Sequence, residues 1–155
     1  MSFYQLRTQL KIHAPIEAVW KFISSPQNLR QITPDHMDFQ ITSEELPERI
    51  YEGMIIKYNV RPLLGIRTNW VTEITHIREG QYFVDEQRVG PYRMWHHQHI
   101  IEPDGKDTIM KDIVSYQPPL GIFGALINRF VIQKELDKIF EYRTKSLNSI
   151  FDEKA

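Results

Sequence analysis

The densest group of side chains that could do chemistry is the segment 95–99, Trp-His-His-Gln-His. Its surroundings favour a strand, in which side chains alternate between two faces, so His97 and His99 share one face with Trp95 while His96 lies on the other. Imidazoles serve as general acids and bases, as hydrogen-bond partners of ligands and as metal ligands. The segment therefore places two such groups side by side.

A carboxylate lies within reach across the next hairpin. The turn residues 103–105, Pro-Asp-Gly, precede a second strand-like segment, and closing the hairpin there puts His97 opposite Asp112 and His99 opposite Met110. Asp112 would orient the His97 imidazole and favour its charged form, whereas burial would oppose that charge. His97 and Asp112 are therefore the candidate catalytic residues.

Three interpretations of this cluster stay open. The histidines could simply pair with cross-strand partners inside a wet sheet. They could instead join Asp112 as polar anchors in an otherwise apolar ligand pocket. The third interpretation is chemistry, either proton transfer by His97 and Asp112 or a metal held by His97, His99 and Asp112. Because the chain has no cysteine and two histidines are a weak metal signal, we expect no metal and no cofactor.

Strands and a long helix are expected to position these residues. Alternating segments predict strands at 3–13, 37–43, 53–61, 66–77, 82–89, 92–101 and 108–116, with short helices after Pro15 and Pro26. Short connectors between the later strands predict an antiparallel meander. Asp85 and Glu86 lie on opposite faces of one strand, so they are not a carboxylate pair for acid–base hydrolysis, although one of them could point inward.

An apolar stripe predicts one long amphipathic helix from near Gly121 to about residue 150. Charged residues, including Lys134, Arg143 and Lys145, supply its solvated face. The segment 120–132 is apolar nearly all round, which indicates either a pocket gate or packing under neighbouring loops. A sheet that buries one face on such a helix curls around it and encloses a pocket, so we expect an α+β fold.

Composition narrows the class of protein. With 155 residues and 41% hydrophobic residues, the chain is expected to form a single domain over residues 1–155. The formal net charge of −1 provides no basic field for nucleic acid. A Gly-rich phosphate loop and a Gly-x-Ser-x-Gly elbow are both absent from the sequence. No signal-like segment or membrane span is evident, so we expect a cytoplasmic protein.

The order of elements, with the stretches 26–29, 33–34, 53–58, 83–87, 90–92 and 108–116, resembles the Bet v 1-like helix-grip superfamily, also called SRPBCC or START-like. Within it, the chain is similar to bacterial single-domain ligand-binding proteins related to polyketide cyclase/dehydratases and cell-division inhibitors. The resemblance implies a seven-stranded curved antiparallel sheet, two short helices and a long C-terminal helix around a cavity for lipids, sterols, polyketides or aromatic metabolites. It does not imply one reaction.

The expected function is binding of a small hydrophobic or amphipathic molecule, as carrier or sensor rather than enzyme. One alternative is a cyclase/dehydratase- or isomerase-type enzyme using His97 and Asp112, and a lower one is a regulatory domain that binds a protein partner. We expect a monomer or homodimer without stable membrane insertion. The expected ligand contacts are Trp70, Asp85, Gln87, Trp95, His97, His99, Met110, Asp112, Phe123 and Ile127.

Overall fold

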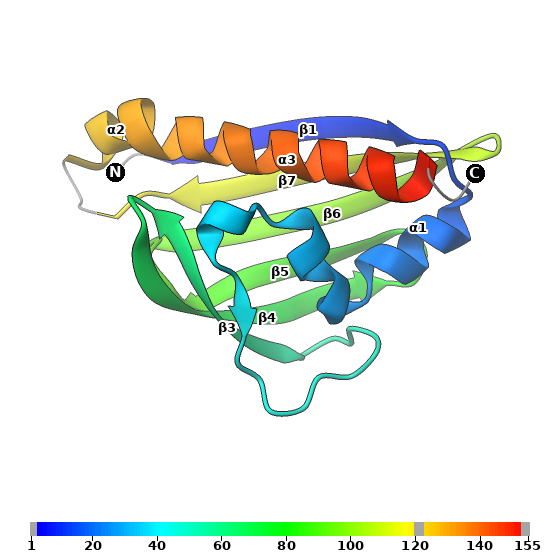
Figure 1. Ribbon diagram of the computed structural model, residues 1–155, viewed down its shortest axis with the longest axis horizontal. Helices are drawn as coiled ribbons and strands as arrows, with labels where there is room; N and C mark the ends of the chain where they lie inside the picture. The colour runs from blue at the N-terminus through cyan, green and yellow to red at the C-terminus, as the bar shows by residue number, and fades with distance from the viewer. Residues whose placement is uncertain (1–2, 120–122, 153–155) are drawn as a thin grey trace.

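The computed structural model describes residues 3–119 and 123–152 of the chain. Within these residues seven antiparallel strands form one sheet, in the order β1-β7-β6-β5-β4-β3-β2 (Figure 1). Consecutive strands from β2 to β7 are neighbours, and β1 pairs with β7, so the sheet is a meander with the first strand added at its far edge. The bounds are β1 Tyr4–Ile12, β2 Gln40–Ile41, β3 Ile55–Leu63, β4 Ile66–Arg78, β5 Tyr82–Val89, β6 Met94–Asp104 and β7 Asp107–Gln117.

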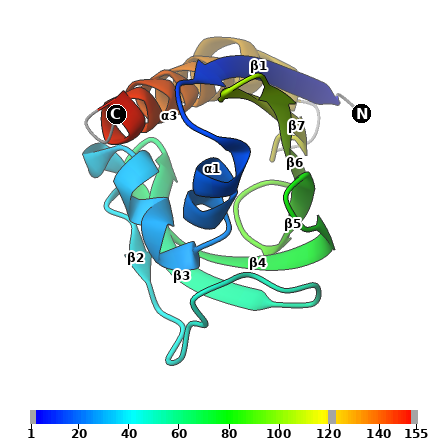
Figure 2. The ribbon, with the colours of Figure 1, turned by 90° about the vertical axis from the view of Figure 1, so that its right-hand side faces the viewer.

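Side-chain alternation gives the sheet one buried and one wetter face. In β7, Thr108, Met110, Asp112 and Val114 are buried, and the residues between them are half-exposed. This is the period of two that a half-buried strand requires. The sheet curves strongly, and its concave face holds the interior (Figure 2).

Three short helical segments connect β1 to β2. They are α1 Ile16–Ile23 and the 3₁₀ turns η1 Pro26–Ile32 and η2 Asp35–Met37. A proline with its φ already fixed opens each of the first two: Pro15 caps α1, and Pro26 begins η1. Viewed along the long axis, α1 lies inside the curve of the sheet (Figure 2). The two predicted short helices are thus confirmed, the second as a 3₁₀ helix.

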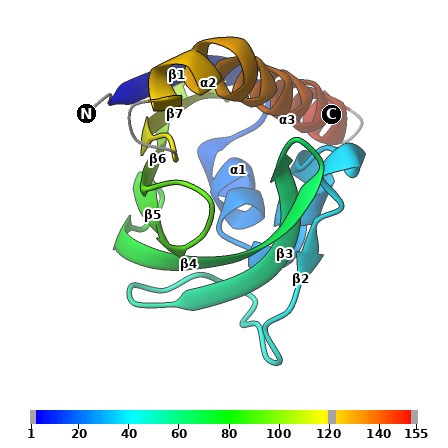
Figure 3. The same cartoon turned by 90° about the vertical axis from the view of Figure 1, so that its left-hand side faces the viewer.

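One helical run lies across the open side of the sheet. It consists of α2 Gly124–Ile127, the π-helical segment η4 Asn128–Ile132 and α3 Gln133–Asp152. The buried residues of α3 recur every three or four positions, at Leu136, Phe140, Arg143, Leu147 and Phe151. The helix contacts β1 on one side and η1 on the other, which closes the curve of the sheet (Figure 3). The predicted start near Gly121 lies outside the described residues.

The predicted register of the β6–β7 hairpin is wrong by two residues. His97 pairs with Val114 and His99 pairs with Asp112, because the strands continue to Asp104 and Asp107 around a tight two-residue turn. Gly105 in that turn has φ 65°, a conformation that glycine adopts at little steric cost. A shift of two residues leaves every side chain on its predicted face, so His97, His99 and Asp112 still point to the concave side.

The predicted strand at 37–43 shortens to the two residues of β2, Gln40 and Ile41. Met37 belongs to a 3₁₀ turn, and Asp38 takes a left-handed conformation with φ 46°, which turns the chain before pairing begins. β2 therefore caps only the outer edge of β3.

Two apolar clusters fill the interior. One surrounds Trp20, Phe83 and Leu147 near α1, and the other surrounds Trp70, Tyr116 and Phe140 near the opposite end. Among the described residues, no helix is both long and apolar enough to cross a membrane.

Candidate ligand-binding site

A cavity of about 180 Å³ lies between the concave face of the sheet, the η1–η2 segment and α3. Its walls draw on both apolar clusters. Leu29 and Ile32 come from η1, Val60 comes from β3, and Leu136 and Phe140 come from α3. A concave, mostly apolar space with a few convergent polar groups is the usual form of a small-molecule site.

Three aromatic rings form one wall. The ring centroids of Trp70 and Trp95 are 5.4 Å apart at 89°, and those of Tyr92 and Trp95 are 4.9 Å apart at 43°. Trp70 also meets Tyr92 edge to face at 5.7 Å. Such offset and edge-on arrangements are the favourable ones for aromatic pairs. The indole Nε1 of Trp70 is buried and has no hydrogen-bond partner among the described residues, so it is a donor without an acceptor.

A charged wall adjoins the aromatic one, since the ring centroids of Trp95 and His97 are 6.3 Å apart. Three neighbouring strands and the helix build this charged wall. Pairing of β5 with β6 sets Asp85 beside His97 and Phe83 beside His99, and pairing of β6 with β7 sets His99 beside Asp112. Asp85, His97 and His99 line the cavity, whereas Asp112 lies behind the two imidazoles and is not among the lining residues.

The two histidines share two carboxylates. His97 Nε2 lies 2.9 Å from Asp112 Oδ1, and His99 Nδ1 lies 3.2 Å from the same oxygen. On the other side, His99 Nε2 lies 2.5 Å and His97 Nδ1 lies 3.6 Å from Asp85 Oδ2. Each imidazole therefore has one nitrogen facing each carboxylate, and the rings pack with centroids 3.7 Å apart.

Arg143 of α3 completes the cluster, contrary to its predicted place on the solvated face. Its side chain is only 9% exposed, and its Nε lies 3.4 Å from Asp112 Oδ2. Its Nη2 reaches Asp112 Oδ1 at 3.5 Å and His99 Nδ1 at 3.2 Å. The sequence holds the signal that was missed, since Arg143 follows Phe140 by three residues and precedes Leu147 by four, within the apolar stripe.

These contacts set the charges of the cluster. Burial alone would raise the pKa of Asp112, but the Arg143 guanidinium and hydrogen bonds with His97 and His99 hold that pKa well below its usual range. The pKa of Asp85 is likewise lowered, because its hydrogen bond with His99 and the nearby positive charges outweigh burial. Both carboxylates are ionised at neutral pH.

The pKa values of the two imidazoles shift in opposite directions. Burial, reinforced by the charge of His99, lowers the pKa of His97 despite its bond to Asp112. Burial opposes charge on His99 too, but hydrogen bonds with Asp112 and Asp85 together raise its pKa. In the absence of other ligands, His97 is the neutral imidazole and His99 carries the extra proton more readily.

The adjacent residues in sequence face the other way. His96 Nδ1 lies 2.7 Å from Glu86 Oε1 on the outer face, where Glu86 also meets Arg88. Both Glu86 and His96 keep more than a quarter of their side chains exposed, at 28% and 30%. The strands thus carry an inner histidine–carboxylate set and an outer one.

The structure places the other predicted contacts as follows. Trp70 and Trp95 line the cavity. Gln87 instead binds the backbone of Tyr92 with its side-chain amide, at 2.7 Å and 3.2 Å, and so closes the β5–β6 connection. Met110 is buried in the apolar core, at 1% exposure.

Phe123 is 62% exposed at the start of α2, and Ile127 packs against the second apolar cluster. Ligand contact by Gln87, Met110, Asp112, Phe123 and Ile127 stays a prediction.

Several lining residues did not follow from the sequence. They come from strands whose faces depend on pairing, or from the helix, and they are Tyr58, Thr72, Phe83, Tyr92, Leu136 and Phe140. The hydroxyls of Tyr58 and Thr72 are 3.0 Å apart, so this polar pair is satisfied internally.

Comparisons with known proteins identify the family and the fold of the chain. Residues 12–141 match the family described as polyketide cyclase / dehydrase and lipid transport, and the chain belongs to that family. No curated protein sequence matches the chain significantly.

Solved structures share the fold at low sequence identity. A START superfamily protein from Mycobacterium smegmatis has a TM-score of 0.73 at 14% identity, over 97% of this chain and 99% of its own. The major latex-like protein 151 of Panax ginseng has a TM-score of 0.65 at 12% identity, over 96% and 97% of the two chains. A Thermus thermophilus protein has a TM-score of 0.67 at 18% identity, over 94% and 95%. The helix-grip fold of the Bet v 1-like and START-like proteins is thereby established.

Proposed function

We propose that the protein binds a small hydrophobic or amphipathic molecule in the cavity, as a carrier or sensor. The observation that carries this proposal is the largely apolar cavity, whose walls include adjoining aromatic residues and the Asp85–His97–His99 group. Apolar walls supply affinity through burial, and a few fixed polar groups orient the ligand.

The cavity volume narrows the class of ligand. About 180 Å³ slightly exceeds the roughly 150 Å³ of an engineered cavity that holds benzene, and is below the roughly 300 Å³ at which drug-sized pockets begin. One or two rings fit without movement, whereas a sterol or a whole lipid requires α3 or η1 to move outward. Among lipids, polyketides and aromatic metabolites, an aromatic metabolite with one hydroxyl or carbonyl group is therefore the favoured ligand.

A proton-transfer enzyme is the second candidate, and the 2.9 Å contact between His97 and Asp112 favours it. The carboxylate fixes His97 through Nε2 and leaves Nδ1 on the side of Asp85, where a bound carbonyl compound could exchange a proton with it. Asp112, however, already serves His99 and Arg143 as well. That shared use is typical of a structural network, and it supports the carrier over the enzyme.

Native mass spectrometry of the freshly purified protein tests the proposal. We expect one small organic adduct per chain, released by solvent extraction. A clean unliganded mass would argue against a retained cargo. For the enzyme, His97→Gln would have to abolish turnover of a bound carbonyl compound while leaving its affinity unchanged. The cytoplasmic location and the state of monomer or homodimer stay predictions from the sequence.

A further inference from the structure

The charged wall has an arrangement of nitrogen and oxygen atoms that suits a metal ion, a role beyond the orientation of a ligand. Asp85, His97 and His99 each offer one ligand atom, and these atoms all lie within 4.8 Å of one another. The sequence alone suggested Asp112 as the third member of such a set. Asp112 instead lies on the far side of the imidazoles, and Asp85 takes the near side.

Hydrogen bonds fix the orientation of both imidazoles. Asp112 Oδ1 accepts from His97 Nε2 at 2.9 Å, which leaves the lone pair of His97 Nδ1 on the side of Asp85. His99 Nδ1 lies 3.2 Å from the same oxygen and accepts from Arg143 Nη2 at 3.2 Å, so His99 Nε2 holds the proton that it shares with Asp85 and must release it when a metal ion binds. In metal sites, a ligating histidine almost always donates its other N–H to a carboxylate or carbonyl group. Asp112 does this for His97, whereas the far nitrogen of His99 is held by Arg143.

The charge balance of the cluster also favours a bound cation. With neutral imidazoles, Asp85 and Asp112 carry two negative charges against the single positive charge of Arg143. Arg143 also lines the cavity, but its guanidinium contacts His99 at Nδ1, the nitrogen turned away from Asp85. One uncompensated buried carboxylate is costly, and a proton or a metal ion must balance it.

From this geometry we propose that Asp85, His97 and His99 bind a divalent transition metal of the zinc type, through the Asp85 carboxylate, His97 Nδ1 and His99 Nε2. Two histidines and one carboxylate with an open fourth position form a known class of zinc site. The open position faces the cavity, where it would take an oxygen atom of the ligand, such as a phenolate, enolate or carboxylate.

Zinc coordination by these three residues requires one small movement, that of the Asp85 side chain. Ligand atoms around a tetrahedral zinc ion are about 3.3 Å apart, given bonds of roughly 2.0–2.1 Å. The distance from His97 Nδ1 to Asp85 Oδ2 is already 3.6 Å, whereas that from His99 Nε2 to the same oxygen is 2.5 Å, a hydrogen-bond length. The Asp85 side chain is 16% exposed at the cavity edge, so it can withdraw from His99 when an ion replaces the shared proton.

Titration of chelator-treated protein with Co²⁺ and Zn²⁺ tests the site. We expect one equivalent of Zn²⁺ to bind by calorimetry, and one equivalent of Co²⁺ to give the visible absorption of a four-coordinate nitrogen and oxygen site. Asp85→Asn should weaken binding by more than 100-fold, while Glu86→Gln, the next residue on the opposite face, should leave it unchanged. His97→Gln and His96→Gln form a second matched pair, and Asp112→Asn should weaken binding by about 10- to 100-fold.

Folding of each variant is verified by circular dichroism, and the melting temperature gives an independent readout. Zn²⁺ should raise the melting temperature of the wild type and of Glu86→Gln, but not that of Asp85→Asn. Absence of stoichiometric binding to the wild type at 1 mM metal, or equal binding by Asp85→Asn and Glu86→Gln, would overturn the proposal. Binding of a hydrophobic probe in the presence of the chelator is measured separately, so loss of the metal site and loss of the proposed cavity function can be distinguished.

Discussion

Replacing Arg143 with leucine removes the guanidinium that pairs with Asp112. The two side chains are 9% and 7% exposed, and their closest nitrogen and oxygen atoms are 3.4 Å apart. Leucine fits the apolar stripe of α3, so the perturbation is mainly the loss of charge. Asp112 then keeps only the two histidines as partners, and its carboxylate remains buried.

The expected cost follows from that unpaired charge. Removing one partner of a buried ion pair typically costs about 3–5 kcal/mol. For a chain of this length each kcal/mol lowers the melting temperature by roughly 2–4 °C, so the expected loss is about 6–20 °C. Urea denaturation followed by circular dichroism measures the free energy of unfolding directly.

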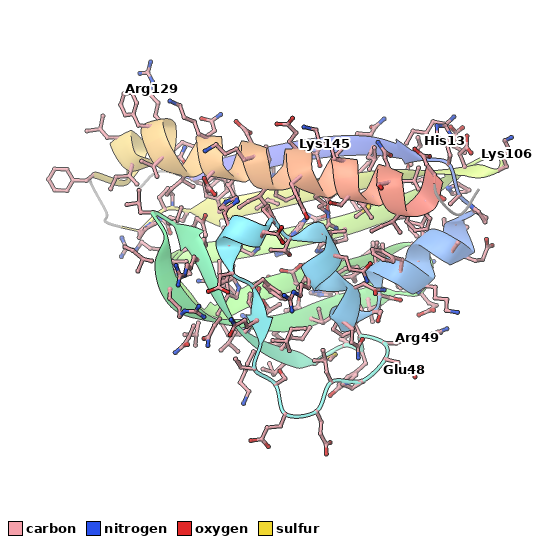
Figure 4. All side chains as sticks on the ribbon, in the orientation of Figure 1. His13, Glu48, Arg49, Lys106, Arg129 and Lys145 are labelled. Atoms are coloured by element: carbon pink, nitrogen blue, oxygen red, sulfur yellow. The ribbon has the colours of Figure 1, made fainter. Side chains whose placement is uncertain are left out.

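Two controls isolate the charge effect. Lys145→Leu alters the same helix two residues later, on its outer side where the side chain is 74% exposed (Figure 4), and it should change stability by less than about 0.5 kcal/mol. Adding Asp112→Asn to Arg143→Leu removes both charges, so the double variant should be more stable than the sum of the single effects by about 0.5–3 kcal/mol. A cost below about 1 kcal/mol for Arg143→Leu, or strict additivity, would refute the inferred pairing.

Three further predictions concern the frame around the site. Thr108→Val removes the hydroxyl that donates to the carbonyl of Ala14 at 2.8 Å in a fully buried position, and urea denaturation should show a loss of about 1–3 kcal/mol. Gly105→Ala places a Cβ at φ 65° in the β6–β7 turn and should cost about 1–2 kcal/mol by the same assay, with no effect contradicting the turn. Burial raises the pKa of Tyr92. The contribution of Tyr92 to the free energy of unfolding is therefore fully present below the ordinary tyrosine pKa of about 10 and is lost as the pH rises above it. Tyr92→Phe should flatten that fall in stability between about pH 9 and 11.

Local periodicity predicted more of this protein than long-range pairing could. The alternation of segment 95–99 placed Trp95, His97 and His99 on one face, and the structure agrees, because a strand alternates whatever its neighbours are. The register was wrong because it depends on where the turn closes, and Gly105 allows a two-residue turn. The shift by an even number of residues kept Asp112 near His97 all the same.

The role of Asp85 could not be derived from local periodicity. Asp85 reaches the histidines only because β5 pairs with β6 in one particular register, which the β5–β6 connection sets. The charged residues of α3 together predict a solvated face that includes Arg143, whereas the spacing of Arg143 within the apolar stripe indicates the buried place that it takes.

The most direct test of the account is calorimetric titration of the ligand-free protein with 2-naphthol, a two-ring molecule with one hydroxyl group. Val60 lines the cavity at 1% exposure, and Val60→Phe should fill part of it; Val89, 54% exposed at the end of β5, provides the matched control Val89→Phe. We predict one-to-one binding by the wild type and Val89→Phe, and at least tenfold weaker binding by Val60→Phe. Equal affinity in all three proteins, or none in the wild type, would contradict a ligand-binding cavity.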